Sequence, residues 1–407
     1  MIAIAFRVAL ERSEELRSEL LAHVKAVPWL LMLIPLCGLC VGAALWLILR
    51  LCPEAAGSGI PHLRRILREN GRLDWRRVIP VKFASGLLGI GGGLCLGREG
   101  PTIQMGAALG AMWGESHLGT GTDRRSLLVT GASAGLAAAF NAPMAGILFA
   151  IEELHINIPD SAFFAAMTAS ISADLLARMI LGQAPVLGVT LTQGPPPLDS
   201  LPFFLVLGVL TAFLAWGFNK AIVLATRRLA FRSLRGNIAK VATAGLVLAV
   251  AGWFDPTWLG GGLPLVNRAL SGQGTLLWLG GILALRFALT IGSYAIGTAG
   301  GIFAPLLVLG GLLGLFVGEV SQQIFPAAVP EPAAFAVVGM AAMFAAVIRA
   351  PLTGIVLIIE MTGHYGLILP LMITSFTASL VADELVVTPV YDALLESQIA
   401  QERSASE

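Results

Sequence analysis

The sequence predicts an all-α integral membrane protein made of two inverted-topology repeats of tilted and re-entrant helices. Three observations lead to this prediction: the composition, a set of motifs that occurs twice, and a difference in charge between the two halves. Of the 407 residues, 56% are hydrophobic and 13% are charged, and the mean hydropathy is +0.82. A soluble domain of this length would be far less apolar, so we expect the chain in a lipid bilayer.

Four short motifs recur in the same order about half a chain later. The pairs are 57–61 with 260–264, 82–83 with 286–287, 97–101 with 301–305, and 131–152 with 339–360. In the first and third pairs, only the first copy has ionisable or hydroxyl side chains at its central positions, as in Gly57-Ser58-Gly59-Ile60-Pro61 against Gly260-Gly261-Gly262-Leu263-Pro264. Internal repeats whose hydrophobic segments are broken by Gly and Pro at matching places are typical of secondary transporters.

The hydrophobic segments differ in length. Windows such as 29–51, 201–224 and 241–254 are long or apolar enough to cross or enter the membrane, whereas many others are short and interrupted by glycine. Glycine is unusually frequent, and its four-residue spacings let helices approach one another closely. We therefore expect partial and re-entrant helices beside full spans.

The charges predict the orientation. The segment 64–77 has six arginines against two acids, and 227–240 has four arginines and one lysine without an acid, so both are expected in the cytoplasm. Their repeat counterparts are the weakly charged 265–277 and the stretch 11–25, which has four acids and three bases and was interpreted as a loop. Equivalent loops on opposite sides indicate an inverted repeat, with the proline-rich link on the outside.

The expected division follows from this alignment. It gives a first membrane repeat over 1–193, a Pro-rich linker over 194–200, a second membrane repeat over 201–395, and a short charged tail over 396–407. The first helix is interpreted as truncated, because the counterpart of 201–222 near residues 1–10 is short.

The motifs resemble the signature of the CLC family of chloride channels and chloride/proton exchangers. The match consists of 57–61, of Gly97-Arg98-Glu99-Gly100-Pro101, of Gly301-Ile302-Phe303-Ala304-Pro305, and of a late Tyr391. The resemblance spans roughly residues 30 to 400 and implies the CLC-type fold and a homodimer with a pore in each subunit. No nucleotide-binding pair of domains is recognised, which suits a multi-pass protein of a bacterial cytoplasmic membrane.

In physical terms, each motif is a Gly/Pro break that starts a short helix inside the membrane. The first backbone N–H groups of such a helix are unpaired and lie at its positive dipole end, which attracts anions. Several helix starts aimed at one point can replace the hydration shell of an anion without binding it too tightly to let it leave.

The resemblance assigns the chloride-binding residues. A central chloride would be coordinated by the hydroxyls of Ser58 and Tyr391 and by the N–H groups of Ile302 and Phe303, with Gly57 in the same motif. An outer site would be formed by N–H groups near Arg98, Gly100, Phe303 and Ala304. Taken alone, Ser58 would be interpreted as a turn residue and Tyr391 as an interfacial aromatic.

Two carboxylates are the candidate proton carriers. Glu99 lies between glycines at a helix start inside the membrane, which is costly unless the residue has a function; it is expected to act as external gate and proton carrier. Glu153 resembles the internal proton-transfer glutamate of the exchangers. Glu152 is matched by Glu360 in the second half, so that pair is interpreted as structural, whereas Glu153 is matched by Met361.

The sequence does not decide the roles of four basic residues. Lys82 and Arg286 occupy equivalent positions, and they either raise the positive potential of the vestibules or extend their charges to the membrane surface. Arg64 and Arg65 stand where related bacterial exchangers tend to have acids, which leaves the field of the inner vestibule undetermined.

The expected function is a chloride/proton antiporter, with a passive, gated chloride channel as the alternative. The carboxylate of Glu153 favours the antiporter, and the intact 57–61 motif disfavours fluoride export. A serine hydrolase is a weaker hypothesis, based on the G-x-S-x-G pattern of 131–135 and on His155. No metal site or cofactor other than the transported chloride is expected, the four cysteines are interpreted as small apolar fillers, and a net charge of +1 argues against nucleic acid as a partner.

Overall fold

The structure, a computed structural model, describes residues 1–26, 35–117, 124–154, 160–183, 186–188, 194–229, 237–271, 274–386 and 388–406. Over these ranges the chain is almost entirely helical and contains no β-strand, only isolated β-bridges. The helices of the first half are α1 (Ile2–Ala26), α2 (Pro35–Leu51), α3 (Ile60–Glu69), α4 (Trp75–Gly91), α5 (Glu99–His117), α6 (Arg124–Phe140), α7 (Pro143–Glu152) and α8 (Asp160–Leu181).

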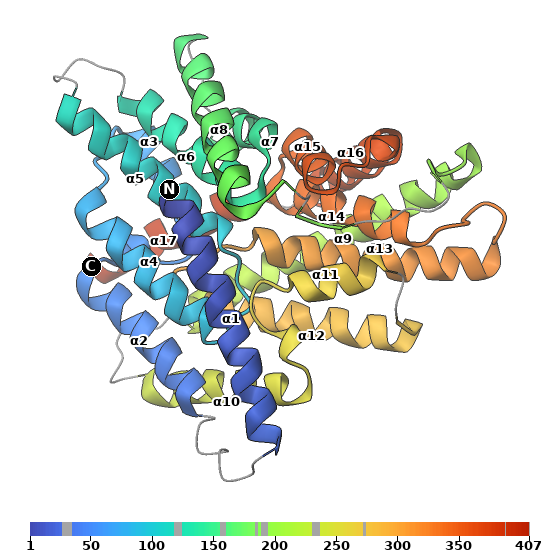
Figure 1. The fold of residues 1–407 in the computed structure, drawn as a ribbon, viewed down its shortest axis with the longest axis horizontal. Coiled ribbons are helices and arrows are strands. Elements are labelled where there is room, and N and C mark those ends of the chain that lie inside the picture. The colour runs from blue at the N-terminus through green and yellow to red at the C-terminus, as the bar shows by residue number, and fades with distance from the viewer. Residues whose placement is uncertain are drawn as a thin grey trace.

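The second half repeats this order. Its helices are α9 (Leu201–Leu229), α10 (Ile238–Phe254), α11 (Leu263–Leu270), α12 (Leu276–Ala295), α13 (Phe303–Ile324), α14 (Ala333–Ile348), α15 (Pro351–Thr362) and α16 (Ile368–Glu384), followed by α17 (Val390–Ser406). In Figure 1 much of the first half lies on the left and α11 to α13 lie on the right, while α10 of the second half lies beside α2.

Equivalent helices start in the same way. Helices α3 and α11 are both preceded by a glycine in the left-handed region, Gly59 at φ 82° and Gly262 at φ 84°, and both have proline in the first turn. A residue with a β-carbon would be strained at this φ, and proline suits a first turn because no N–H partner is lost there. The repeat in the sequence is therefore a repeat of local backbone structure.

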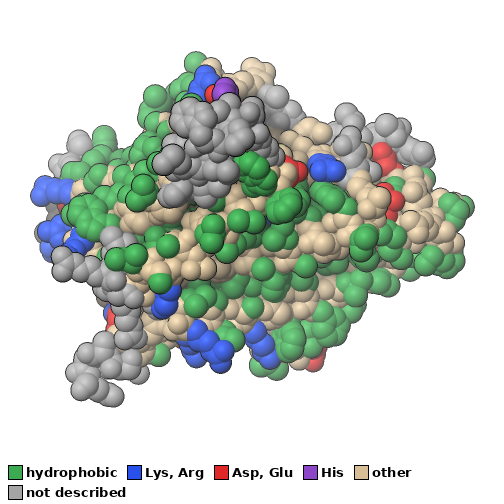
Figure 2. All heavy atoms as spheres, turned by 90° about the horizontal axis from the view of Figure 1, so that it is seen from below, with side chains coloured by type: hydrophobic (Ala, Val, Ile, Leu, Met, Phe, Trp, Pro, Cys, Tyr) green, Lys and Arg blue, Asp and Glu red, His purple; other side chains and the backbone are tan. Residues whose placement is uncertain are grey.

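Within the described ranges, five helices are long and apolar enough to cross a membrane, and several apolar helices are shorter. The five spans are Ser161–Leu181, Leu198–Leu229, Leu276–Ala295, Phe303–Ile324 and Tyr365–Glu384. Figure 2 shows one face on which many hydrophobic side chains are exposed and charged side chains form only small groups. This mixture of long and short helices agrees with the prediction of full and partial spans in a membrane protein.

Glycines set the closest helix contacts in both halves. A β-carbon on Gly106 of α5 would collide with the backbone of Gly131 of α6, and one on Gly310 of α13 would collide with Gly339 of α14. The two pairs are equivalent in the repeat. The glycine-rich composition thus permits backbone-to-backbone packing at corresponding places.

The interpretation of residues 11–25 as a loop is wrong. These residues lie within α1, which is 25 residues long, against 29 for its counterpart α9. The charges are accommodated because they form pairs along the helix and with its neighbours: Arg7 contacts Glu11, and Arg17 donates to the carbonyl oxygens of Ile90 and Gly91. The many charges of this segment favour a loop when the sequence is considered alone, but the segment is part of a helix.

Helix α17 returns to the first half of the molecule (Figure 1). It contacts α3 and α9, and it continues through the boundary at residue 395 that the sequence suggested for a charged tail. Arg65 of α3 pairs with Glu402, and Arg227 of α9 donates to Ser397. Arg65 and Arg227, one from each arginine-rich stretch, therefore contact the same helix.

Candidate functional site

Three breaks between helices are joined by backbone hydrogen bonds. The N–H of Gly57 donates to the carbonyl of Thr298 at 3.0 Å, and the N–H of Gly300 donates to the carbonyl of Gly57 at 2.9 Å. Gly97 and Gly301 exchange two N–H to carbonyl bonds of 2.7 Å. The starts of α3, α5 and α13 are consequently held together.

Glycine is required where these breaks touch. A β-carbon on Gly100 would lie 2.9 Å from the backbone of Ser58, and one on Gly301 would lie 2.8 Å from the nitrogen of Gly100. The predicted chloride-binding segments, far apart in the sequence, are thus in direct contact. Because the first N–H groups of each helix lack partners within the helix, the junction concentrates hydrogen-bond donors and positive dipole ends.

Glu99 is the first residue of α5 and lies at this junction. It is 3% exposed, its carboxylate lies against Gly97, and the backbone nitrogen of Ala304 lies at the same position. Its Oε2 atom has no hydrogen-bond partner among the described residues. The carboxyl group of Glu99 therefore lies beside Ala304, one of the residues predicted for the outer anion site.

The side chain of Arg98 points to α1. It pairs with Glu11 at 2.9 Å, and Glu11 also contacts Arg7. Only the backbone of Arg98 remains for the predicted outer site, as the sequence analysis expected.

Ser58 and Tyr391 are both buried. The ring of Tyr391 lies 6.2 Å from that of Phe303 between centroids, and its hydroxyl has no hydrogen-bond partner among the described residues. Such a buried hydroxyl needs a partner, since an unsatisfied one costs about 1–3 kcal/mol. A chloride ion between Ser58 and Tyr391 would provide it.

Sequence reasoning missed Tyr294 of α12. Its hydroxyl lies against Gly57 and interacts with the backbone and the hydroxyl of Ser58. The chain has only three tyrosines, so a buried one eight residues before Ile302 was a signal that could have been followed. Tyr294 therefore adds a third hydroxyl to the cluster, with Ser58 and Tyr391, that is predicted for the central chloride.

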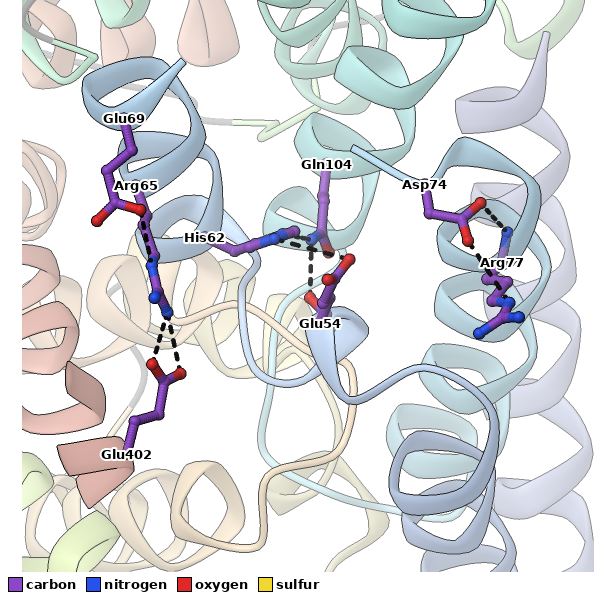
Figure 3. A network of polar contacts seen from close by, with 8 residues as sticks. All are labelled: Glu54, His62, Arg65, Glu69, Asp74, Arg77, Gln104 and Glu402. Atoms are coloured by element: carbon purple, nitrogen blue, oxygen red, sulfur yellow. Dashed lines mark hydrogen bonds and ion pairs between the residues drawn. The ribbon is translucent and has the colours of Figure 1, made fainter. Parts of the chain in front are cut away.

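A polar cavity of about 450 Å³ leads to this cluster. Ser58 and Tyr294 line it together with His62 and Arg65 of α3 and with Glu402 of α17. Figure 3 shows Arg65 between Glu69 and Glu402, with both Glu402 oxygens 2.9 Å from the same nitrogen of Arg65.

The same view shows His62 and Gln104 turned toward each other. The amide of Gln104 donates to the Glu54 carbonyl at 3.0 Å and lies 3.1 Å from the Nδ1 atom of His62. The lining of the cavity therefore contains both cations and carboxylates. The sequence left the electrostatic field of the inner vestibule undetermined, and in the structure the guanidinium of Arg65 is paired with Glu69 and Glu402.

Glu153 lies at the C-terminal end of α7 and is paired with Arg64. Both side chains are buried, at 1% and 2% exposure. The Nε of Arg64 donates to the carbonyl of Glu153 at 2.9 Å, and its NH2 nitrogen lies 2.9 Å from Oε1 in an ion pair whose angle is outside hydrogen-bonding geometry. The NH1 nitrogen lies 2.8 Å from Asp392 of α17.

Lys82 and Arg286 are fully buried and do not extend to a surface. Lys82 donates to the carbonyls of Ala55 and Gly57 at 3.0 and 2.7 Å, and Arg286 donates to those of Trp258, Gly260 and Gly261. The alternative in which they snorkel is wrong. Lys82 thus holds the loop before α3, and Arg286 holds the equivalent loop before α11.

The serine of the hydrolase pattern is not on a turn. Ser133 is buried in the middle of α6, whereas a nucleophile of this pattern is exposed at a turn between a strand and a helix. His155 lies outside the described residues. Among the residues that the structure describes, no group of three His, Cys, Asp or Glu could hold a metal, and the four cysteines are free.

Known proteins are similar over nearly the whole chain. The family model described as voltage gated chloride channel matches residues 37–383. The H(+)/Cl(-) exchange transporter ClcA of Vibrio campbellii is 39% identical over 410 residues, covering 99% of this chain and 86% of the relative, and ClcA of Salmonella typhimurium is 37% identical over 411 residues.

A solved structure agrees with this likeness. The crystal structure of a slow cyanobacterial Cl-/H+ antiporter has a TM-score of 0.93 and 35% identity, and covers 98% of this chain and 95% of its own. The chain therefore belongs to the voltage gated chloride channel family, the CLC family.

Proposed function

We propose that the protein is a chloride/proton antiporter. The observation that carries the proposal is a pair of buried carboxylates near the predicted chloride site: Glu99 lies against Gly97 at the joined helix starts, and Glu153 pairs with Arg64 of α3, the helix that starts just after Ser58. The relatives with high identity are named as exchangers, which supports the antiporter over the channel.

The geometry suggests how the two ions share steps. When ionised, Glu99 is attracted to the backbone N–H groups at the helix starts and competes with chloride for them. When protonated, it loses that attraction and leaves the position to the anion. Chloride entry on one side thus favours protonation of the same group, which links the two movements.

Glu153 gives the proton a separate inner position. It lies beside Arg64, which also pairs with Asp392, while chloride would enter through the cavity lined by Ser58 and Tyr294. Two approaches to one centre allow the ions to move in opposite directions.

The proposal includes the setting. The partners are chloride, protons, the lipid of a bacterial cytoplasmic membrane and a second copy of the chain, with no cofactor. Exposed apolar side chains of α8, such as Ile171, Leu175 and Met179, suit a lipid or protein neighbour. Cross-linking in native membranes tests for the dimer.

The test of the function is a flux measurement. Liposomes that contain the purified protein receive a chloride gradient without a pH gradient, the voltage is clamped with valinomycin, and the external pH is recorded. Proton movement driven by chloride, lost in Glu153→Gln while chloride flux continues, is expected. The control is Glu15→Gln, an exposed carboxylate of α1 that pairs with Arg12. Chloride flux without proton movement in the parent protein would leave a passive channel.

A further inference from the structure

Arg64 connects three elements that each contribute to the candidate site. It belongs to α3, which starts just after Ser58; it contacts Glu153 at the end of α7; and it contacts Asp392, the neighbour of Tyr391 on α17. Arg68 also binds Asp392, at 2.9 Å. A single guanidinium is thus shared between the inner proton site and the helix that carries the chloride-coordinating tyrosine.

The charges around Glu153 make Arg64 decisive. Among the described residues, those that act on the Glu153 carboxylate are Arg64, Asp392, Glu152 and Tyr391. Arg64 is the cation in this set, and the other three are acids or a neutral hydroxyl. Because an opposite charge at this distance favours the ionised carboxylate, Arg64 opposes the uptake of a proton at Glu153.

Asp392 weakens this opposition. It takes one nitrogen of the same guanidinium and adds a negative charge near Glu153. Any movement of α17 that changes the distance between Arg64 and Asp392 therefore changes how firmly Glu153 holds its negative charge.

We propose that Arg64 is a positioning residue that sets when Glu153 accepts a proton, with its hold on Glu153 adjusted by Asp392 on α17. The proposal rests on the proposed antiport. It links proton entry to α17, the helix that carries Tyr391, so that the predicted central chloride site and the inner proton site respond to the same movement of α17.

The test uses two substitutions with opposite expected effects. In Arg64→Met the cation is lost, so the pH at half-maximal chloride-driven proton flux should rise by about one to three units, the usual effect of a nearby opposite charge. In Asp392→Asn the whole guanidinium is left to Glu153, so this midpoint should fall. A merely structural role would lower the activity of both variants without moving their midpoints in opposite directions.

Controls separate charge from folding. Arg125→Met removes an exposed cation that binds Asn70 at the end of α3, and its midpoint should equal that of the parent. Arg64→Lys keeps the charge and should restore the parental midpoint in part. Equal midpoints in the parent, Arg64→Met and Asp392→Asn would overturn the proposal.

Failure of the antiport itself gives a different result. A parent protein that moves chloride without protons overturns the proposed function and leaves the role of Arg64 to a direct titration. Infrared difference spectra of the Glu153 carboxyl, assigned with Glu153→Gln, should show the same opposite shifts in the two variants. An unmoved carboxyl band would overturn the role of Arg64 without reference to transport.

Discussion

Glu152 and Glu360 cap each other's helices. The Glu152 carboxylate at the end of α7 accepts from the N–H groups of Leu352 and Thr353 at the start of α15, and Glu360 at the end of α15 accepts from Met144 and Ala145 at the start of α7. The two helices therefore run in opposite directions. This exchange displays the inverted repeat at the level of single hydrogen bonds.

Removal of either carboxylate should destabilise the protein to a similar extent. Charged hydrogen bonds to helix N-termini contribute about 1–3 kcal/mol, so Glu152→Ala and Glu360→Ala should each lower the free energy of unfolding by that amount. Thermal unfolding in detergent measures the effect. The folded fraction should keep its proton coupling, and loss of coupling in Glu152→Ala alone would contradict the structural interpretation.

Tyr294→Phe should bind chloride more tightly. The Tyr294 hydroxyl lies beside Ser58 and would compete with an anion for its hydroxyl, and loss of an interaction worth about 0.5–1.5 kcal/mol corresponds to roughly a two- to tenfold change in affinity. Calorimetric titration with chloride measures it, with the exposed Tyr365→Phe as control. Weaker binding would show instead that Tyr294 coordinates the anion itself.

Lys82→Met and Arg286→Met should both lower the stability of the protein, but only Lys82→Met should also affect function. Each removes a charged donor from a set of buried carbonyls, so each should lower stability by a few kcal/mol. Only Lys82 holds the loop that carries Ser58, so only Lys82→Met should also weaken chloride binding. Equal chloride affinity in the two variants would show that the loop keeps its shape without Lys82.

The stability contributed by Asp392 should depend on pH. Burial alone would raise the pKa of Asp392, but the guanidinium groups of Arg64 and Arg68 outweigh it and hold this pKa below its usual value of about 4. The folded pKa is the lower one, so the stabilisation is complete above the unfolded pKa and is lost as the pH falls through the folded pKa.

The comparison of the parent with Asp392→Asn measures this dependence. The parent should be the more stable at pH 7, and the difference in unfolding temperature should decrease below about pH 4. A difference that stays constant with pH would mean that charge on Asp392 does not contribute.

Most of the helical repeat can be predicted from the sequence, because it is encoded in short motifs of neighbouring residues. The glycine before α3 and the one before α11 require the same backbone conformation, and such short-range rules are visible in neighbouring residues. The sequence also predicts a structural role for Glu152 and Glu360, because they occupy equivalent positions in the two halves, but it does not predict that they cap helices. Comparison within one chain was enough for these features.

What the sequence did not show depends on contacts between distant segments. The partner of Arg64 lies 89 residues away, and Tyr294 meets Ser58 from the other half of the chain. The helix of α1 was missed because its charges are paired across elements, and a periodic pattern within one segment does not contain that information.

The hydrogen bonds between the breaks at Gly57, Gly97 and Gly301 limit how the site can open. A shift of one helix start would have to drag the other two along, because the main chain itself joins them. Gating by whole-helix movement at this point is therefore costly, and rotation of single side chains within a fixed ring of backbone is the cheaper route. The protein can admit and exclude an anion while its most central scaffold stays still.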